Sequence, residues 1–242
     1  MGHQLDGAFE RVNRAEEHFF ELQRHLNALR QSYLDAARIH FDPNPPYRAY
    51  AYPPINIVHP PIISIVLGEI CYNLRSALDY LVYELARFDS NAIQDGTQFP
   101  IDDTRSKFVG HKHPMLKGIS IAHEAKIEKF QPYNGCIWTK TLRTLSNPDK
   151  RRTLTPRGSV FTVDVLDGGK SIEIGHGRRL VRHAKRPDGR DVQVELVGSF
   201  EIIVTVNVHP TMGDIGDSVE VTAENLILNV RDLLETFKPE FK

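Results

Sequence analysis

Cysteine is scarce in this chain of 242 residues, which contains only Cys71 and Cys136. Two thiols cannot form a disulfide framework or a four-thiolate zinc site, so neither scaffold is expected. Long apolar runs are missing as well, since the longest, Ile62 to Leu67, includes a serine and is followed by Gly68-Glu69. The N-terminus has no apolar signal core. These absences predict a cytoplasmic protein that does not associate with membranes.

An excess of charge is also missing. Thirty Lys and Arg residues face 31 Asp and Glu residues, which gives a formal net charge of -1. This balance excludes a strongly basic nucleic-acid coat protein and an acidic tail. Hydrophobic residues make up 40% of the chain and charged residues 25%, as in soluble globular proteins of one or two domains. The one mild excess is eleven histidines, which motivates a search for catalytic or metal-binding groups.

Apolar residues at helical spacing predict most of the secondary structure. A first helix is expected to start near Asp6 and to end by His40, and a second, with a stripe of leucine and isoleucine, is expected from Ile63 to near Phe88. Shorter helices are expected after Ile101, from Ile121 to Phe130 and around Trp138 to Leu145, where Asn147-Pro148 ends the last of them. Seven of the fifteen prolines lie between Pro43 and Pro61. They predict an extended strap over the helices, which is favoured over a peptide-binding arm.

From Ser159 the apolar period changes to two, which predicts β-strands. Strands are expected at 160–166, 171–174, 192–197 and 200–208, with a hairpin turn at Pro187-Asp188-Gly189. Thr222 is expected to cap a last helix that ends near Phe237. The predicted fold class is α+β, mainly a helical bundle with a small antiparallel β insertion before the last helix. The predicted domains are a bundle at 1–153, the β insertion at 154–211 and a C-terminal helix at 212–242 that completes the bundle.

Two clusters were weighed as sites. His111-Lys112-His113 is a candidate metal site, but Gly110 and Pro114 around it predict a solvated loop, and no second ligand pair follows at zinc spacing. No metal and no cofactor are therefore predicted. The stretch from His176 to Arg190 has six basic residues against one acidic residue, which makes it a candidate phosphate-binding hairpin. It has no aromatic residue for base stacking, so a solvated hairpin is the favoured interpretation.

The second predicted helix carries an unusual polar set beside its apolar stripe. Arg75 and Asp79 are four residues apart and share one flank, whereas Asn73 and Tyr80 occupy the other. Candidate partners after the fourth helix are Asn147, Asp149 and Lys150. One interpretation is a structural network, because polar groups at the edge of a core must be paired. The other is a ligand-binding site in one open concavity, in which Arg75 clamps an anion beside Asp79.

Several short motifs occur together between residues 60 and 152. In chain order they are Asn73-Leu74-Arg75-Ser76-Ala77-Leu78-Asp79-Tyr80, Phe99-Pro100-Ile101, Gln131-Pro132-Tyr133 and Asn147-Pro148-Asp149-Lys150-Arg151-Arg152. This set resembles a family of uncharacterised bacterial proteins with the signatures Asn-Leu-Arg-Ser-Ala-Leu-Asp-His, Phe-Pro-Ile, Gln-Pro-Tyr and Asn-x-Asp-Lys-His-Arg. The resemblance implies no known activity.

More distantly, arginine followed by histidine on a bundle helix is similar to the signature of HEPN domains. That likeness implies a helical bundle whose site is composite across a homodimer, and in many members a metal-independent ribonuclease of toxin or phage-defence systems. Arg75 would take the arginine role. Position 80, which would take the histidine role, is Tyr, and position 151, where the bacterial family has a histidine, is Arg. Histidine transfers protons near neutral pH, whereas tyrosine, with a reference pKa of about 10, is a poor base there.

The favoured hypothesis is therefore a HEPN-like binding module for nucleotide, RNA or a protein partner, without efficient catalysis. Its candidate ligand-binding residues are Arg75, Asp79, Tyr80, Asn73, Asn147, Asp149 and Lys150. The alternative is an active ribonuclease that uses Arg75, Asp79, Tyr80 and Lys150. A third hypothesis is a structural helical protein whose polar set is only a buried network.

Overall fold

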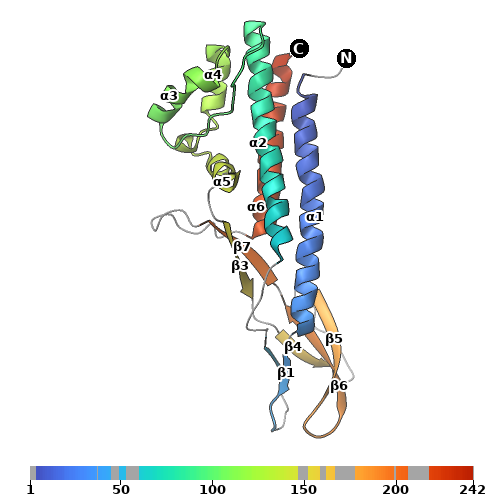
Figure 1. The fold of residues 1–242 in the computed structure, drawn as a ribbon. Coiled ribbons are helices and arrows are strands. Elements are labelled where there is room, and N and C mark those ends of the chain that lie inside the picture. Colours follow the sequence, from blue (N-terminus) through green and yellow to red (C-terminus); the bar gives the residue numbers. More distant parts are fainter. Residues whose placement is uncertain are drawn as a thin grey trace. The chain divides into compact units, whose positions relative to one another are not determined.

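The computed structural model describes residues 4–36, 38–44, 49–52, 60–146, 152–158, 162–166, 178–198, 200–206 and 218–241. These ranges are mainly helical with short strands, which confirms the predicted α+β class (Figure 1). The helices are α1 (Asp6–Ala36), α2 (Pro61–Ser90), α3 (Arg105–Met115), α4 (Ile121–Glu128), α5 (Ile137–Ser146) and α6 (Val219–Phe237), with the 3-10 helices η1 (Pro132–Asn134) and η2 (Lys238–Phe241). The strands are β1 (Arg38–Phe41), β2 (Ala49–Tyr52), β3 (Arg152–Gly158), β4 (Thr162–Leu166), β5 (Arg178–Lys185), β6 (Asp191–Gly198) and β7 (Phe200–Val206). None of the described helices combines the length and apolarity that a membrane crossing requires.

Two compact units make up the chain. The first, here named the helical unit, comprises residues 1–23, 61–153 and 204–242. The second, the β unit, comprises residues 24–60 and 154–203. The β unit therefore includes residues 24–60, which the sequence pattern assigned to the bundle.

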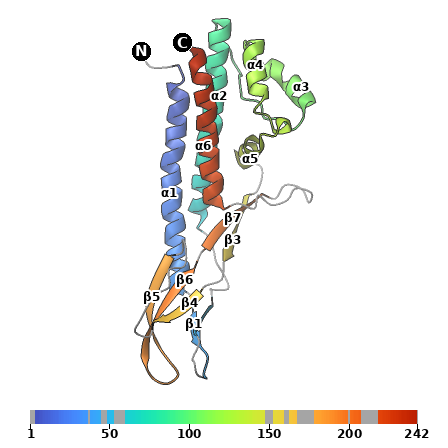
Figure 2. The same cartoon turned by 180° about the vertical axis from the view of Figure 1, so that it is seen from behind.

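Long helices form the core of the helical unit, in which α2 packs against α6 and the first part of α1 runs beside them (Figures 1 and 2). Proline suits the first position of α2 because its φ is preset and the amide at that position has no helical acceptor. The predicted stripe is fully buried, and its members are Ile63, Leu67, Ile70, Leu74, Leu78, Leu81 and Leu85. Each such side chain contributes about 1.5–3 kcal/mol on burial, so this stripe is the main stabilising feature of the unit. An ion pair between Arg231 and Glu16, 2.7 Å apart, joins α6 to α1.

One predicted helix end is confirmed, and one predicted helix start is wrong. The first helix ends at Ala36, within the predicted limit of His40, which belongs to β1. The last helix begins at Val219, where Ser218 is extended and its hydroxyl accepts a hydrogen bond from the amide of Val221. Thr222, the predicted cap, is buried inside the first turn.

In the β unit the predicted proline-rich strap begins with a hairpin instead. Strands β1 and β2 pair antiparallel, with Arg38 opposite Tyr52 and Phe41 opposite Ala49, and β2 lies beside β4. Alternating tyrosines in β2 favour a strand, because aromatic side chains pack well on a pleated surface. Residues 45–48 and 53–59 of the predicted strap lie outside the described residues.

The other strands form one sheet of order β4-β6-β5, with antiparallel pairing, and a pair of β3 with β7. The hairpin turn predicted at Pro187-Asp188-Gly189 is confirmed: Arg186 N donates to Arg190 O at 2.9 Å, and Gly189 has a φ of 88°, which favours glycine. Val192 and Val194 are buried while the alternate residues are exposed, so this end of β6 has one covered face. The strand predicted at 171–174 lies outside the described residues.

Candidate ligand-binding site

Arg75 and Asp79 lie one turn apart on α2 and together hold the backbone of Phe99. The Arg75 guanidinium donates from Nη2 to Phe99 O at 2.5 Å, and Asp79 Oδ1 accepts a hydrogen bond from Phe99 N at 2.9 Å. The two side chains are 3.5 Å apart and form an ion pair. Because the Phe99 ring is fully buried, this arrangement positions the chain that follows α2.

Two further side chains continue the arrangement along residues 99–103, which we name the clamped segment. Gln131 is fully buried; its Nε2 donates to Pro100 O and its Oε1 accepts from Asp102 N, both at 2.9 Å. Arg143 on α5 donates to Ile101 O and, through Nη2, to both carboxylate oxygens of Asp103, all at 2.8 Å. The Phe-Pro-Ile and Gln-Pro-Tyr motifs therefore meet in one hydrogen-bonded structure.

Burial dominates the electrostatics of the Arg75–Asp79 pair. Desolvation lowers the pKa of Arg75, although Asp79 raises it and the nearby Arg143 lowers it further. Desolvation also raises the pKa of Asp79, against the opposing effects of Arg75 and the Phe99 amide. The side chains are 24% and 31% exposed. The pair is thus a partly desolvated structural contact, and the Arg75 guanidinium is engaged by protein groups.

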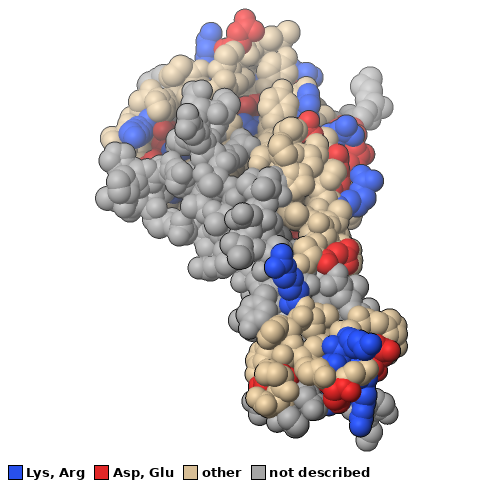
Figure 3. All heavy atoms as spheres, turned by 60° about the horizontal axis from the view of Figure 1, so that its bottom comes forward, with Lys and Arg blue, Asp and Glu red and all other residues tan. Residues whose placement is uncertain are grey.

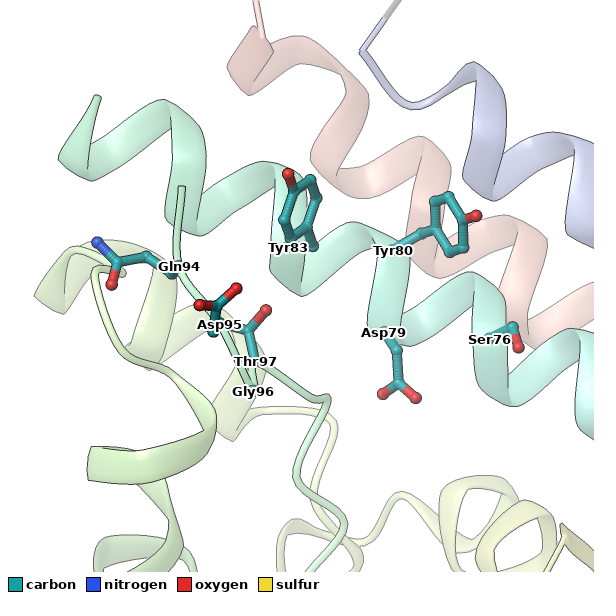
Figure 4. A pocket seen from close by; sticks show the side chains of 8 residues that line it. All are labelled: Ser76, Asp79, Tyr80, Tyr83, Gln94, Asp95, Gly96 and Thr97. Atoms are coloured by element: carbon teal, nitrogen blue, oxygen red, sulfur yellow. The ribbon is translucent and has the colours of Figure 1, made fainter. Parts of the chain in front are cut away.

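A cavity of about 440 Å³ opens beside this pair, within the usual size range of small-molecule sites. Its walls come from α2 and from residues 94–97, which lie opposite (Figure 4). The lining residues are Ser76, Asp79, Tyr80, Tyr83, Gln94, Asp95, Gly96 and Thr97. Two of these described residues are acidic and none is Lys, Arg or His, so the lining is formally negative, with Arg75 paired to Asp79 beside it. We name this feature the α2 cavity.

Tyr80 lines the cavity and also packs against α1. The guanidinium carbon of Arg11 lies 5.6 Å from the centroid of its ring. A Cβ atom at Gly7 would lie 3.2 Å from two ring carbons, so glycine is what permits the close approach. The ring is therefore fixed from the neighbouring helix while its residue stays 41% exposed.

The predicted site residues separate into three groups. Asp79 and Tyr80 line the α2 cavity, whereas Arg75 faces the clamped segment. Asn73 belongs to neither, because it is buried, accepts from Arg11 at 3.4 Å and donates to Glu69 O at 2.9 Å. The remaining three, Asn147, Asp149 and Lys150, lie outside the described residues.

Two histidines are held by carboxylates that the sequence analysis did not pair with them. His111 lies within α3, not in the predicted loop, and its Nδ1 is 2.8 Å from the buried Asp102. His123 is buried, with Nδ1 2.7 Å from Asp89 and Nε2 3.5 Å from Glu240. Across the described ranges, no group of three His, Cys, Asp or Glu side chains is arranged to hold a metal ion.

Gln131, Tyr83 and Asp95 are the functional candidates that the sequence reasoning missed. The Gln-Pro-Tyr break is the sequence signal that could have identified Gln131, which the structure shows to be buried. Residues 94–97 show no periodicity that would place them opposite α2. No family model, curated protein or solved structure matches this chain.

Proposed function

We propose that the helical unit is a binding module without efficient catalysis and that the α2 cavity is its ligand site. The observation that carries the proposal is the contrast around Asp79: its neighbour Arg75 is engaged by Phe99, while the adjacent face of α2 opens onto a polar, aromatic cavity. A cavity with a few convergent polar groups is the usual form of a small-molecule site.

The ribonuclease alternative requires an arginine and a proton-transferring group that face the same phosphodiester. Arg75 is bound to Phe99 O and Asp79, and Tyr80 packs against Gly7 and Arg11. Cys136 is no better as a nucleophile, because burial raises the pKa of its thiol. These contacts support binding over catalysis.

Charge narrows the ligand class. Asp79 and Asp95 repel phosphate, so the cavity favours a ligand that presents hydrogen-bond donors or positive charge. In the basic hairpin, Arg186 and Arg190 lie 3.4 Å and 3.9 Å from Asp188. On the face in Figure 3, the Lys and Arg atoms of the described residues are interspersed with Asp and Glu. Among nucleotides, RNA and a protein partner, RNA is therefore the least favoured ligand.

The test uses the full chain in two assays. In the first, binding of nucleosides, nucleoside monophosphates, short RNA and amines is followed by NMR for the parent chain, Tyr83→Ala and Tyr72→Ala. Tyr72 is the matched control, because it is exposed on the same helix but does not line the cavity. We expect binding of a small ligand that Tyr83→Ala weakens and Tyr72→Ala preserves.

In the second assay, labelled RNA is incubated with the parent chain and with Arg75→Ala. We expect no cleavage by either. Cleavage that Arg75→Ala abolishes would replace the binding module with the ribonuclease. Absence of binding by every probe in the first assay would reject the α2 cavity as the ligand site.

A further inference from the structure

Two carboxylates line the α2 cavity from different segments of the chain. Asp79 comes from α2 and Asp95 from the 94–97 segment (Figure 4). Asp79 Oδ1 is held by the Phe99 amide and Arg75, yet the side chain keeps 31% of its surface exposed, and Asp95 is exposed. Asp95, together with the exposed part of the Asp79 carboxylate, favours a cation as the ligand charge.

Two aromatic rings complete a cation-binding environment. Tyr80 and Tyr83 are three residues apart on α2 and line the same cavity. The face of such a ring attracts ammonium and guanidinium groups, and Tyr80 already attracts the chain's own Arg11, 5.6 Å from its centroid. The hydroxyl groups of Ser76 and Thr97 add hydrogen-bond acceptors for N–H donors.

The donor set selects an organic cation over a metal ion. Hard divalent metals are bound by six or more oxygen ligands in compact geometry. No described group of three His, Cys, Asp or Glu side chains offers such a site. The faces of tyrosine rings, by contrast, contribute to the binding of ammonium and guanidinium groups, and the apolar carbon chains that carry these groups can pack against the rings.

We propose that the α2 cavity binds a linear organic cation through its ammonium or guanidinium group, which Asp79 and Asp95 pair and Tyr83 covers. This inference rests on the proposed function, since it names the ligand class of the same site. Two sources present this chemistry: a free polyamine, and a Lys or Arg side chain of a peptide. The experiment separates them.

Isothermal titration calorimetry of the full chain tests the inference with four probes. These are spermidine, agmatine, the peptide acetyl-Gly-Arg-Gly-amide, and AMP as a phosphate-bearing nucleotide. Uncharged 1,8-octanediol is the control for chain length. We expect the cations to bind and AMP and the diol not to bind; tighter binding of the peptide than of both amines assigns the source to a protein, and the reverse assigns it to a free amine.

Variants locate the binding. Asp95→Asn is the main variant, because Asp95 is exposed and its substitution leaves the clamped segment intact. We expect it to weaken cation binding about tenfold or more, as loss of a charge-assisted hydrogen bond does. Asp232→Asn, an exposed aspartate on α6, is the matched control and should change nothing. Asp79→Asn should also weaken binding, and its unfolding curve shows whether the fold survives.

The outcomes are distinct. Cation binding that Asp95→Asn leaves unchanged lies elsewhere and overturns the inference. Binding of AMP or nucleosides in place of the cations overturns the ligand class but keeps the binding module. If no probe binds in calorimetry or in the NMR experiments, the inference and the proposed function are both overturned.

Discussion

Asp79 separates two regions of the helical unit that use polar groups in opposite ways. On one side, the clamped segment has its backbone held by Arg75, Gln131 and Arg143. On the other side, the α2 cavity has two carboxylates and no Lys, Arg or His among its described lining residues. Paired polar groups contribute to a fixed structure, whereas Asp95 and the exposed part of the Asp79 carboxylate can still pair with a ligand.

The structural network and the ligand-binding site, the two interpretations of the polar set, apply to different residues of α2. The structural network includes Arg75 and Asn73, and the proposed ligand site includes Asp79 and Tyr80. Substitutions in the clamped segment should therefore change stability, while substitutions in the cavity should change binding.

The largest effect is expected from Gln131→Ala, which breaks the clamp. The substitution leaves Pro100 O and the Asp102 amide without partners in a buried place. We expect the free energy of unfolding to fall by about 2–4 kcal/mol, measured by urea denaturation. Gln98→Ala, at an exposed position next to the clamp, is the control and should change it by less than about 0.5 kcal/mol. Equal effects of the two substitutions would show that the clamp adds no stability.

A smaller loss is expected from Arg75→Met, which keeps the length of the side chain but removes its hydrogen bond to Phe99 O. The expected loss is about 1–2 kcal/mol in the same denaturation experiment. If Arg75 serves structure, spermidine binding to this variant should stay within a few-fold of the parent value. An unchanged stability together with lost binding would move Arg75 from the clamp to the ligand site.

The pH dependence of binding sharpens the contrast further. Burial raises the pKa of Asp79, so this carboxylate takes up its proton at a higher pH than an ordinary aspartate does. Spermidine affinity should fall several-fold as the pH drops through that raised pKa. The same raised pKa means that ionisation of Asp79 costs stability, so its contribution makes unfolding easier as pH rises through the window between the unfolded and folded values. Calorimetry between pH 4 and pH 7 measures the first effect, and Asp79→Asn should remove it.

The smallest effect concerns Glu240, a carboxylate with the opposite behaviour. Hydrogen bonding to Lys126 and interaction with His123 lower its pKa. A lowered folded pKa contributes stability above the ordinary Glu value and loses it as pH falls through the folded pKa. We expect Glu240→Gln to unfold more easily than the parent at pH 7 and to match it in acid, in denaturation curves recorded from pH 3 to pH 7. A difference that persists at pH 3 would contradict this account.

Sequence periodicity predicted the frame of the molecule but not what joins its parts. The buried stripe of α2 and the i, i+4 spacing of Arg75 and Asp79 follow from helical geometry alone. Their shared partner, the backbone of Phe99, could not be inferred, because any residue supplies the same amide and carbonyl groups. Only tertiary contact selects it.

The wrong predictions have equally local causes. Ser218 and Thr222 both suit a helix cap, and the pattern does not say which of the two lies outside the first turn. Gly110 and Pro114 indicated a loop around His111, yet α3 includes both, with the proline in its last turn. Asp102, which holds His111, lies before the helix, where no spacing rule relates the two residues.

Gly7, on α1, contacts a residue that lines the α2 cavity, namely Tyr80. The Tyr80 ring lies close to the backbone of α1 at Gly7. A Cβ atom on that residue would be 3.2 Å from two carbons of the ring. A Gly7→Ala substitution would therefore require the Tyr80 ring or the backbone around it to shift by a few tenths of an ångström. The absence of a side chain on α1 thus contributes to the position of one residue that lines the α2 cavity.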